Sequence, residues 1–133
     1  MLEARITSTE DEKNYVLSVM GEAVHINDQH VIGFWDHEKC VGGAALYSTN
    51  EFPAVISLSI SHKNQIEKIQ LFQKIFKYYL DIYPQIHAIV GLRNHSSCKG
   101  AMQLGFRKLY TTDTDTVLVL TKKLWRYHKK WPI

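Results

Sequence analysis

The hydrophobic positions of this chain follow helical spacing in two stretches and strand-like runs elsewhere. Helical spacing is clearest over residues 65–83, where apolar side chains recur every three or four positions, and we predict that this apolar face is core. A shorter helix is predicted over 10–20. Thr9 is a suitable N-cap for it, Glu12 can complete a capping box, and Gly21 is a natural stop.

Short apolar runs between these helices predict strands. The candidate strands cover residues 2–6, 30–35, 40–47, 54–60, 86–92, 106–110 and 116–121. The polar segment 36–39 predicts a hairpin between the second and third of them. Gly42 and Gly43 interrupt the third strand and predict a bulge or a close approach by another backbone or a ligand. A further short helix is predicted over 95–104, ending at Gly105.

This order of elements predicts one α/β domain. Its sheet is expected to be mostly antiparallel, with one parallel pair around the long helix. A chain of 133 residues and 15.4 kDa suits a single domain. We assign the domain to residues 1–121 and treat 122–133 as a basic, aromatic C-terminal tail.

Composition narrows the class of protein. With 45% hydrophobic and 22% charged residues, the chain is neither disordered, collagen-like nor a disulfide framework. No apolar run approaches the length of a membrane span, and the first residues lack the apolar region of a signal peptide, so a cytoplasmic protein is expected. Cys40 and Cys98 are expected to be reduced thiols.

Positive charge is concentrated at the C-terminal end. The net charge is +3, but residues 122–133 hold five cations and no acid, which leaves 11 cations against 13 acids elsewhere. The five cations are Lys122, Lys123, Arg126, Lys129 and Lys130. Interleaved with aromatic residues, they could contact a nucleic acid or another anionic surface. In the alternative that we favour, the aromatic side chains dock on the domain while the lysines stay solvated.

The element order, with Asn94 eleven residues before Gly105, resembles the GNAT superfamily of acetyl-CoA-dependent N-acetyltransferases. Segments 4–11, 30–35 and 40–47 are similar to the opening and early strands of that family, and the resemblance covers nearly the whole chain. The late family signature is matched by Asn94, Ser97 and the Leu-Gly-Phe of 104–106. The resemblance implies a GNAT-like domain with a mixed, mostly antiparallel sheet of six to seven strands, a long central helix and flanking helices.

The resemblance also implies a site for acetyl-CoA, but the sequence departs from the family there. GNAT enzymes hold the CoA pyrophosphate on backbone N–H groups of a glycine-rich turn at the start of the central helix. Residues 61–68 here read SHKNQIEK, and no glycine occurs between residues 61 and 90. Glu67 would also bring a carboxylate near the phosphates. The resemblance leaves four candidate cofactor-binding residues, which are Lys63, Asn64, Lys68 and, on the pantetheine side, Asn94.

The groups that transfer protons in the family are missing as well. Ala101 stands where a tyrosine often acts as general acid, and the predicted strand 54–60 has no carboxylate to act as general base. His62 and Glu51 are the remaining catalytic candidates, although for His62 we favour the interpretation as part of a polar loop. For Asn94, capping of the next helix is the interpretation that we favour over a contact with pantetheine.

Two classes of function follow. We favour a non-catalytic or weakly catalytic structural or binding protein, similar in length and retained segments to the GNAT-like virion and head-assembly proteins of short-tailed bacteriophages. That similarity implies virion or host proteins as partners, and the host cytoplasm or the virion as location. The alternative is an acetyl-CoA-dependent N-acetyltransferase acting on a small amine or a protein amine. No metal is expected, because His95 and Cys98 lack a second ligand cluster.

Overall fold

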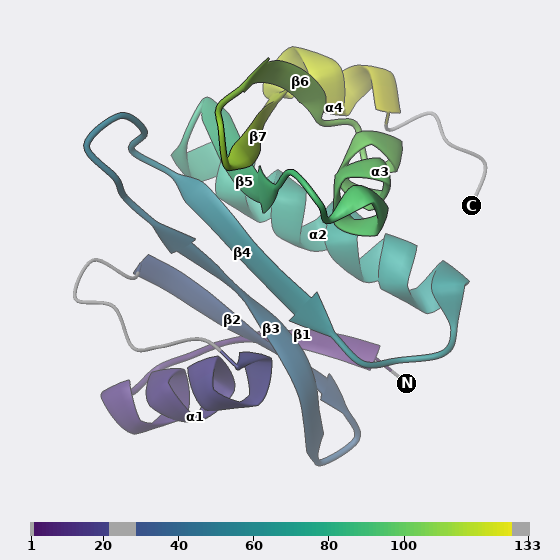
Figure 1. Ribbon diagram of the computed structural model, residues 1–133. Coiled ribbons are helices and arrows are strands. Elements are labelled where there is room, and N and C mark those ends of the chain that lie inside the picture. The colour runs from purple at the N-terminus through teal and green to yellow at the C-terminus, as the bar shows by residue number, and fades with distance from the viewer. Residues whose placement is uncertain (1, 22–28, 129–133) are drawn as a thin grey trace. The chain divides into compact units, whose positions relative to one another are not determined.

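The computed structural model describes residues 2–21 and 29–128, which hold seven strands and four helices (Figure 1). In chain order these are β1 (Leu2–Ile6), α1 (Glu10–Met20), β2 (Gln29–Asp36), β3 (Lys39–Tyr47), β4 (Val55–Ile60), α2 (Gln65–Ile82), β5 (Gln85–Gly91), α3 (His95–Gln103), β6 (Arg107–Thr111), β7 (Asp115–Thr121) and α4 (Lys122–His128). The predicted α/β fold class is confirmed. The chain divides into two compact units, which meet in sequence between Ile75 and Phe76.

The first unit contains an antiparallel sheet in which β1, β2, β3 and β4 pair in chain order. The predicted hairpin at 36–39 is present between β2 and β3. The predicted irregularity in β3 is confirmed, because the β2–β3 register shifts between Phe34 and Trp35. At Gly42 the backbone of β4 approaches so closely that an added Cβ would lie 2.1 Å from the Ser59 carbonyl oxygen. Glycine is therefore required where these strands meet.

Helix α1 begins and ends as the sequence predicts. The Thr9 side chain accepts a hydrogen bond from the Glu12 N–H at 3.1 Å, and Gly21 ends the helix with a left-handed φ of 79°. The Glu12 carboxylate reaches one residue further back than in a standard capping box, accepting hydrogen bonds from the Ser8 N–H and hydroxyl at 2.7 and 2.9 Å. Both ends of α1 are therefore set by local sequence.

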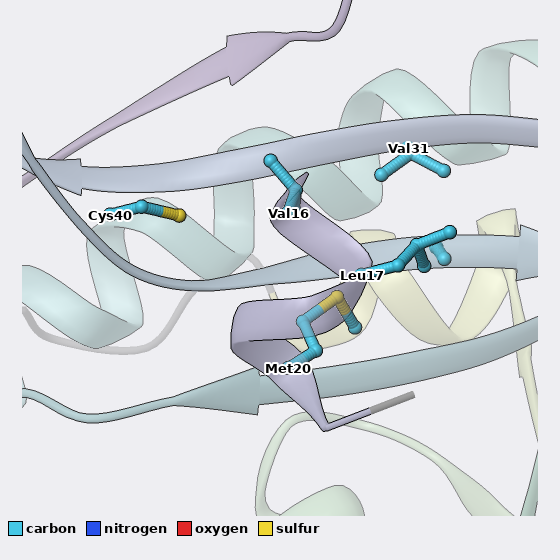
Figure 2. Close-up of a cluster of buried hydrophobic side chains, with 6 residues drawn as sticks. Val16, Leu17, Met20, Val31 and Cys40 are labelled. Carbon is cyan, nitrogen blue, oxygen red and sulfur yellow. The ribbon is translucent and has the colours of Figure 1, made fainter. Parts of the chain in front are cut away.

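One face of α1 packs on the sheet and forms a small core (Figure 2). The buried side chains are Val16, Leu17 and Met20 from α1, Val31 from β2, and Cys40 and Ala45 from β3. Gly43 permits this close packing, because a Cβ there would lie 2.5 Å from Val16. The partly buried Trp35 packs against this cluster. The burial of apolar area between helix and strands is what holds α1 in place.

Helix α2 confirms the strongest sequence pattern, with one correction. Its apolar face is buried at Leu71 and Ile75 in the first unit and at Phe76, Tyr79 and Leu80 in the second. Ile66 was predicted to belong to the core but is 59% exposed. It lies in the first turn of α2, and helical periodicity marks one face of a helix whether or not other elements cover that face.

The second unit is a three-stranded antiparallel sheet in which β7 pairs with both β5 and β6. The hairpin predicted from 106–110 and 116–121 is thereby confirmed. The Phe76 ring packs edge-on against Phe106, with ring centroids 5.7 Å apart. Helix α3 buries none of its residues. No helix in the described part of the chain is both long and apolar enough to cross a membrane.

Candidate functional site

The turn between β4 and α2 is where the resemblance places the cofactor phosphates, and local hydrogen bonds fix its course. The Ser61 N–H donates to the Val41 carbonyl at 2.9 Å, so the chain stays attached to β3 after β4 ends. Asn64 then caps α2, because its side-chain oxygen accepts from the Glu67 N–H at 3.1 Å and its carbonyl accepts from the Lys68 N–H at 3.1 Å. The Asn64 oxygen thus occupies a helix-start N–H that a phosphate would otherwise bind.

His62 lies between two carboxylates in this turn. Its Nε2 is 2.8 Å from Oε2 of Glu67, in the first turn of α2, and its Nδ1 is 4.0 Å from Oδ2 of Asp36, at the end of β2. The His62 side chain is 14% exposed, and those of Glu67 and Asp36 are 29% and 35% exposed. The hydrogen bond from His62 lowers the pKa of the Glu67 carboxyl below its ordinary value. The cluster of Asp36, His62 and Glu67 therefore carries two acids beside one imidazole.

Three of the four candidate cofactor-binding residues, Lys63, Asn64 and Lys68, lie in the turn and helix start that hold His62 and Glu67. Lys63 is exposed next to His62, and Lys68 is half-buried one residue after Glu67. The start of α2 thus offers two ammonium groups close in sequence to the carboxylate of Glu67. An anion bound here would meet attraction from the lysines and repulsion from Glu67, and would compete with the Asn64 cap.

The two catalytic candidates are separated by the structure. Glu51 precedes β4 in the loop that follows β3, whereas His62 follows the other end of the same strand. β4 runs from Val55 to Ile60, so its two ends lie on the order of 17 Å apart. Glu51 precedes one end of this strand and His62 follows the other.

Asn94 belongs to the second unit and caps α3. Its side-chain oxygen accepts from the Ser97 N–H at 3.2 Å, and its carbonyl accepts from the Cys98 N–H at 3.1 Å. The favoured interpretation of this residue as a cap is confirmed. Ala101 lies within the same helix, and its carbonyl accepts the N–H of Phe106 at 3.1 Å as the chain leaves α3.

The described part of the C-terminal tail is helix α4. The Thr121 hydroxyl oxygen accepts the Leu124 N–H at 3.2 Å at its start, and Lys122 and Lys123 are exposed. Trp125 packs edge-on against Phe76 with ring centroids 6.1 Å apart. An aromatic side chain thus docks on the second unit while neighbouring lysines stay solvated, as we favoured. Arg126 lies within α4, and Lys129 and Lys130 lie outside the described residues.

Sequence reasoning missed the pairing of His62 with Glu67 and Asp36. The five-residue separation of His62 from Glu67, across a predicted helix start, was an available signal for the first pair. Nothing local could reveal Asp36, which β2 brings to the turn through sheet pairing. Among residues 2–21 and 29–128, no group of three or more His, Cys, Asp or Glu side chains is arranged to hold a metal ion.

Comparison with solved structures shows that this chain has the GNAT fold. It is similar to apo FdhC, described as a nucleotide-linked sugar GNAT, with a TM-score of 0.71, 12% identity, and 96% of this chain and 90% of that chain covered. An N-acetyltransferase from Staphylococcus aureus gives a TM-score of 0.67 and 16% identity over 91% of this chain and 97% of that one. No protein-family model and no curated protein matches the sequence.

A third similar structure bears on the cofactor. The N-acetyltransferase PseH from Campylobacter jejuni, in complex with acetyl coenzyme A, gives a TM-score of 0.65 and 12% identity, covering 92% of this chain and 99% of that one. In the chain described here, the start of α2 does not fit a CoA pyrophosphate held on backbone N–H groups. The Asn64 cap occupies one such N–H, the Glu67 carboxylate lies in the first turn, and no glycine opens the backbone.

Proposed function

We propose that this chain uses the GNAT fold as a binding or structural protein and does not hold CoA at the start of α2 in the manner of the fold's enzymes. The proposal is independent of the identity of the partner. Function resides in the site and not in the fold, so a shared fold with acetyltransferases leaves the activity of this chain open.

The observation that carries the proposal is the hydrogen bond between His62 and Glu67. It holds a carboxylate, at 2.8 Å from the imidazole, in the first turn of α2. A pyrophosphate at that place would approach a fixed negative charge, which removes much of the advantage that a helix N-terminus offers to an anion. The lysines at 63 and 68 provide charge but no backbone cradle.

An N-acetyltransferase acting on a small amine or protein amine is the second candidate. Its support is the fold itself, which the chain shares with the enzymes compared above over more than nine-tenths of its length. In that case Lys63 and Lys68 would hold the phosphates by side-chain contacts. Proximity of thioester and amine would supply most of the rate, because no general acid or base of the family pattern is present.

Calorimetric titration with acetyl-CoA and with CoA at moderate salt separates the two candidates. We expect no binding up to about 1 mM ligand, which corresponds to a binding free energy smaller in magnitude than about 4 kcal/mol. Micromolar binding that Lys63→Ala weakens at least tenfold, while the exposed Lys39→Ala leaves it unchanged, would instead establish the cofactor site and the second candidate.

A role in a virion or in head assembly is a finer form of the proposal. It is supported by similarity in length and by the retained Asn94 and 104–106 segments. The similar structures are apo FdhC, a nucleotide-linked sugar GNAT, and two N-acetyltransferases. They give no support to a role in a virion or in head assembly. Mass spectrometry of purified particles from the source of this sequence would test it, since a structural role requires the chain to be present in them.

A further inference from the structure

Strand β1 has an open edge in the described part of the molecule. It pairs with β2 on one side, and no other described strand pairs with it. Glu3, Ala4, Arg5 and Ile6 are exposed, and Ile6 is 59% exposed although it is a large hydrophobic residue. An exposed strand edge offers backbone N–H and C=O groups to another strand.

The hydrogen bond from the Thr7 N–H to the Val31 carbonyl, at 3.2 Å, shows which backbone groups of β1 point outward. Thr7 and Val31 continue the antiparallel register of β1 with β2. Hydrogen-bonded and non-hydrogen-bonded residues alternate in such a pair. Odd-numbered residues of β1 therefore bond to β2, and the N–H groups of Ala4 and Ile6 point to the open edge.

This alternation limits how a second β1 strand could pair with the first. Outward-pointing residues must lie opposite one another, so a two-fold axis between antiparallel copies passes through a residue of β1, and only an axis at Glu3, Ala4 or Arg5 pairs three or more residues of the strand. An axis at Glu3 or at Arg5 places like charges directly opposite, which is destabilising. An axis at Ala4 instead places Glu3 of each copy opposite Arg5 of the other.

With the two-fold axis at Ala4, every residue of β1 lies opposite a favourable partner. The sequence LEARI then pairs Leu2 with the partner's Ile6 on one face and Glu3 with the partner's Arg5 on the other, each of them twice. All five residues take part, whereas the other two registers pair only three. The exposed Ile6 gains an apolar neighbour across the strands, and Glu3 and Arg5, which already pair within their own strand, each gain a second partner of opposite sign.

We propose that two copies of this chain associate through their β1 edges, antiparallel and centred on Ala4. The Ala4 N–H donates to the partner's Ala4 carbonyl in both directions, and the Ile6 N–H donates to the partner's Leu2 carbonyl in both directions. The Leu2 N–H makes no hydrogen bond to the partner strand, because it faces the Glu67 carboxylate of its own chain. The two β1–β2 pairs thereby become one continuous antiparallel sheet.

The charged side chains are already held at this edge. The Arg5 guanidinium lies over the Trp35 ring at 5.1 Å and donates from Nη2 to the His37 carbonyl at 3.3 Å, and its Nε contacts Glu3 of the same strand. Both side chains remain about half exposed, at 48% and 57%. Little side-chain entropy is lost when they meet a partner, and the association forms an alternating cluster of two Glu and two Arg side chains.

The association is tested by measuring the sedimentation of the full chain at a series of protein concentrations up to about 1 mM. We expect a reversible dimer in the wild type. Arg5→Glu and Glu3→Arg each place like charges opposite one another, so each alone should raise the dimer dissociation constant at least tenfold. An equimolar mixture of the two variants restores opposite charges at every position and should form a heterodimer within about threefold of the wild-type constant.

Two further variants separate pairing from folding. Ala4→Pro removes an N–H that points away from β2, so it should abolish the dimer while leaving the thermal midpoint nearly unchanged. Arg107→Glu makes the same charge change at an exposed residue of β6 and should leave the dissociation constant unchanged. A wild type that stays monomeric up to 1 mM, or a variant mixture that dimerises no better than its components, would overturn the proposal.

Discussion

At the scale of single residues, this protein is governed by close approach and by charge pairing. Gly42 is required by the β4 backbone, and Asn64 and Thr9 each complete a helix start with one side-chain oxygen. His62 links two carboxylates that are far apart in sequence. These contacts predict the effects of individual substitutions.

Gly42→Ala should destabilise the chain by about 2 to 3 kcal/mol, because an added Cβ would lie 2.1 Å from the Ser59 carbonyl oxygen and 2.8 Å from the Ile60 Cα. Chemical denaturation measures the change. Gly100→Ala in α3 is the matched control, since nothing lies within 4 Å of its added Cβ. It should be neutral or stabilise the chain by up to about 1 kcal/mol. Equal effects of the two variants would contradict the close contact at Gly42.

The Glu67 pair predicts a dependence of stability on pH. Because the hydrogen bond from His62 lowers the pKa of Glu67, its contribution is present above the ordinary carboxyl pKa of about 4.3 and is lost as the pH falls through the lower folded-state value. Thermal midpoints between about pH 6 and pH 3 should therefore fall less steeply for Glu67→Gln than for the wild type.

The control for this measurement is Glu38→Gln, which removes an exposed carboxyl in the β2–β3 turn. Its profile should follow that of the wild type. His87 adds to acid destabilisation in all three proteins, because burial lowers the pKa of its imidazole and protonation then favours the unfolded chain. The difference between Glu67→Gln and the wild type isolates the Glu67 carboxylate together with its partners, the His62 imidazole and the Leu2 N–H, and parallel profiles would rule out their contribution.

At the scale of elements, each helix start is fixed locally, but the helices differ in how much tertiary packing supports them. α1 and α2 bury apolar faces, whereas α3 buries none of its residues. The stability of α3 must therefore depend more on its cap and less on packing. This difference makes Asn94 a sensitive position.

Asn94→Ala should cost about 1 kcal/mol, since it leaves the Ser97 N–H without the side-chain acceptor that now lies at 3.2 Å. Asn94→Ser keeps a capping oxygen and should retain most of the stability. Denaturant titration of the three proteins gives the comparison. A Ser variant as unstable as the Ala variant would show that the asparagine acts through something other than the cap.

At the scale of the whole molecule, charge is divided between a slightly acidic body and a basic C-terminal end. Residues 1–121 hold 11 cations and 13 acids, and 122–133 hold the remaining five cations. In the described part of that end, the Trp125 ring packs edge-on against Phe76. The five cations of residues 122–133 would then supply most of the attraction to a nucleic acid.

We therefore expect no gel shift of single-stranded DNA at about 150 mM salt, where contacts made by a few lysines are strongly weakened. Lysozyme, a basic protein, serves as a positive control for retardation at low salt. A shift that persists at 150 mM salt and disappears on deletion of residues 122–133 would instead establish the tail as a nucleic-acid binding element.

Local sequence signals predicted the seven strands and helices α1, α2 and α3 in their order, but not helix α4 (Lys122–His128), which we expected only as part of a basic, aromatic tail. Helical spacing over 65–83 gave α2, capping residues gave the ends of α1 and α3, and apolar runs gave the seven strands, because these signals are local and repeat within a few residues. The absence of glycine from 61 to 90 and the role of Asn94 as a cap were also readable from the chain alone.

Contacts between residues that are distant in sequence follow from tertiary packing. Sheet pairing brings Asp36 beside His62, β4 holds Glu51 and His62 at opposite ends, and the α1 face is completed by Trp35. Ile66 is exposed because periodicity describes a helix face but not what covers it. The physical reason is the same in each case: a hydrogen-bond cap needs only its neighbours, whereas a charge cluster or a buried face needs strands brought together from far along the chain.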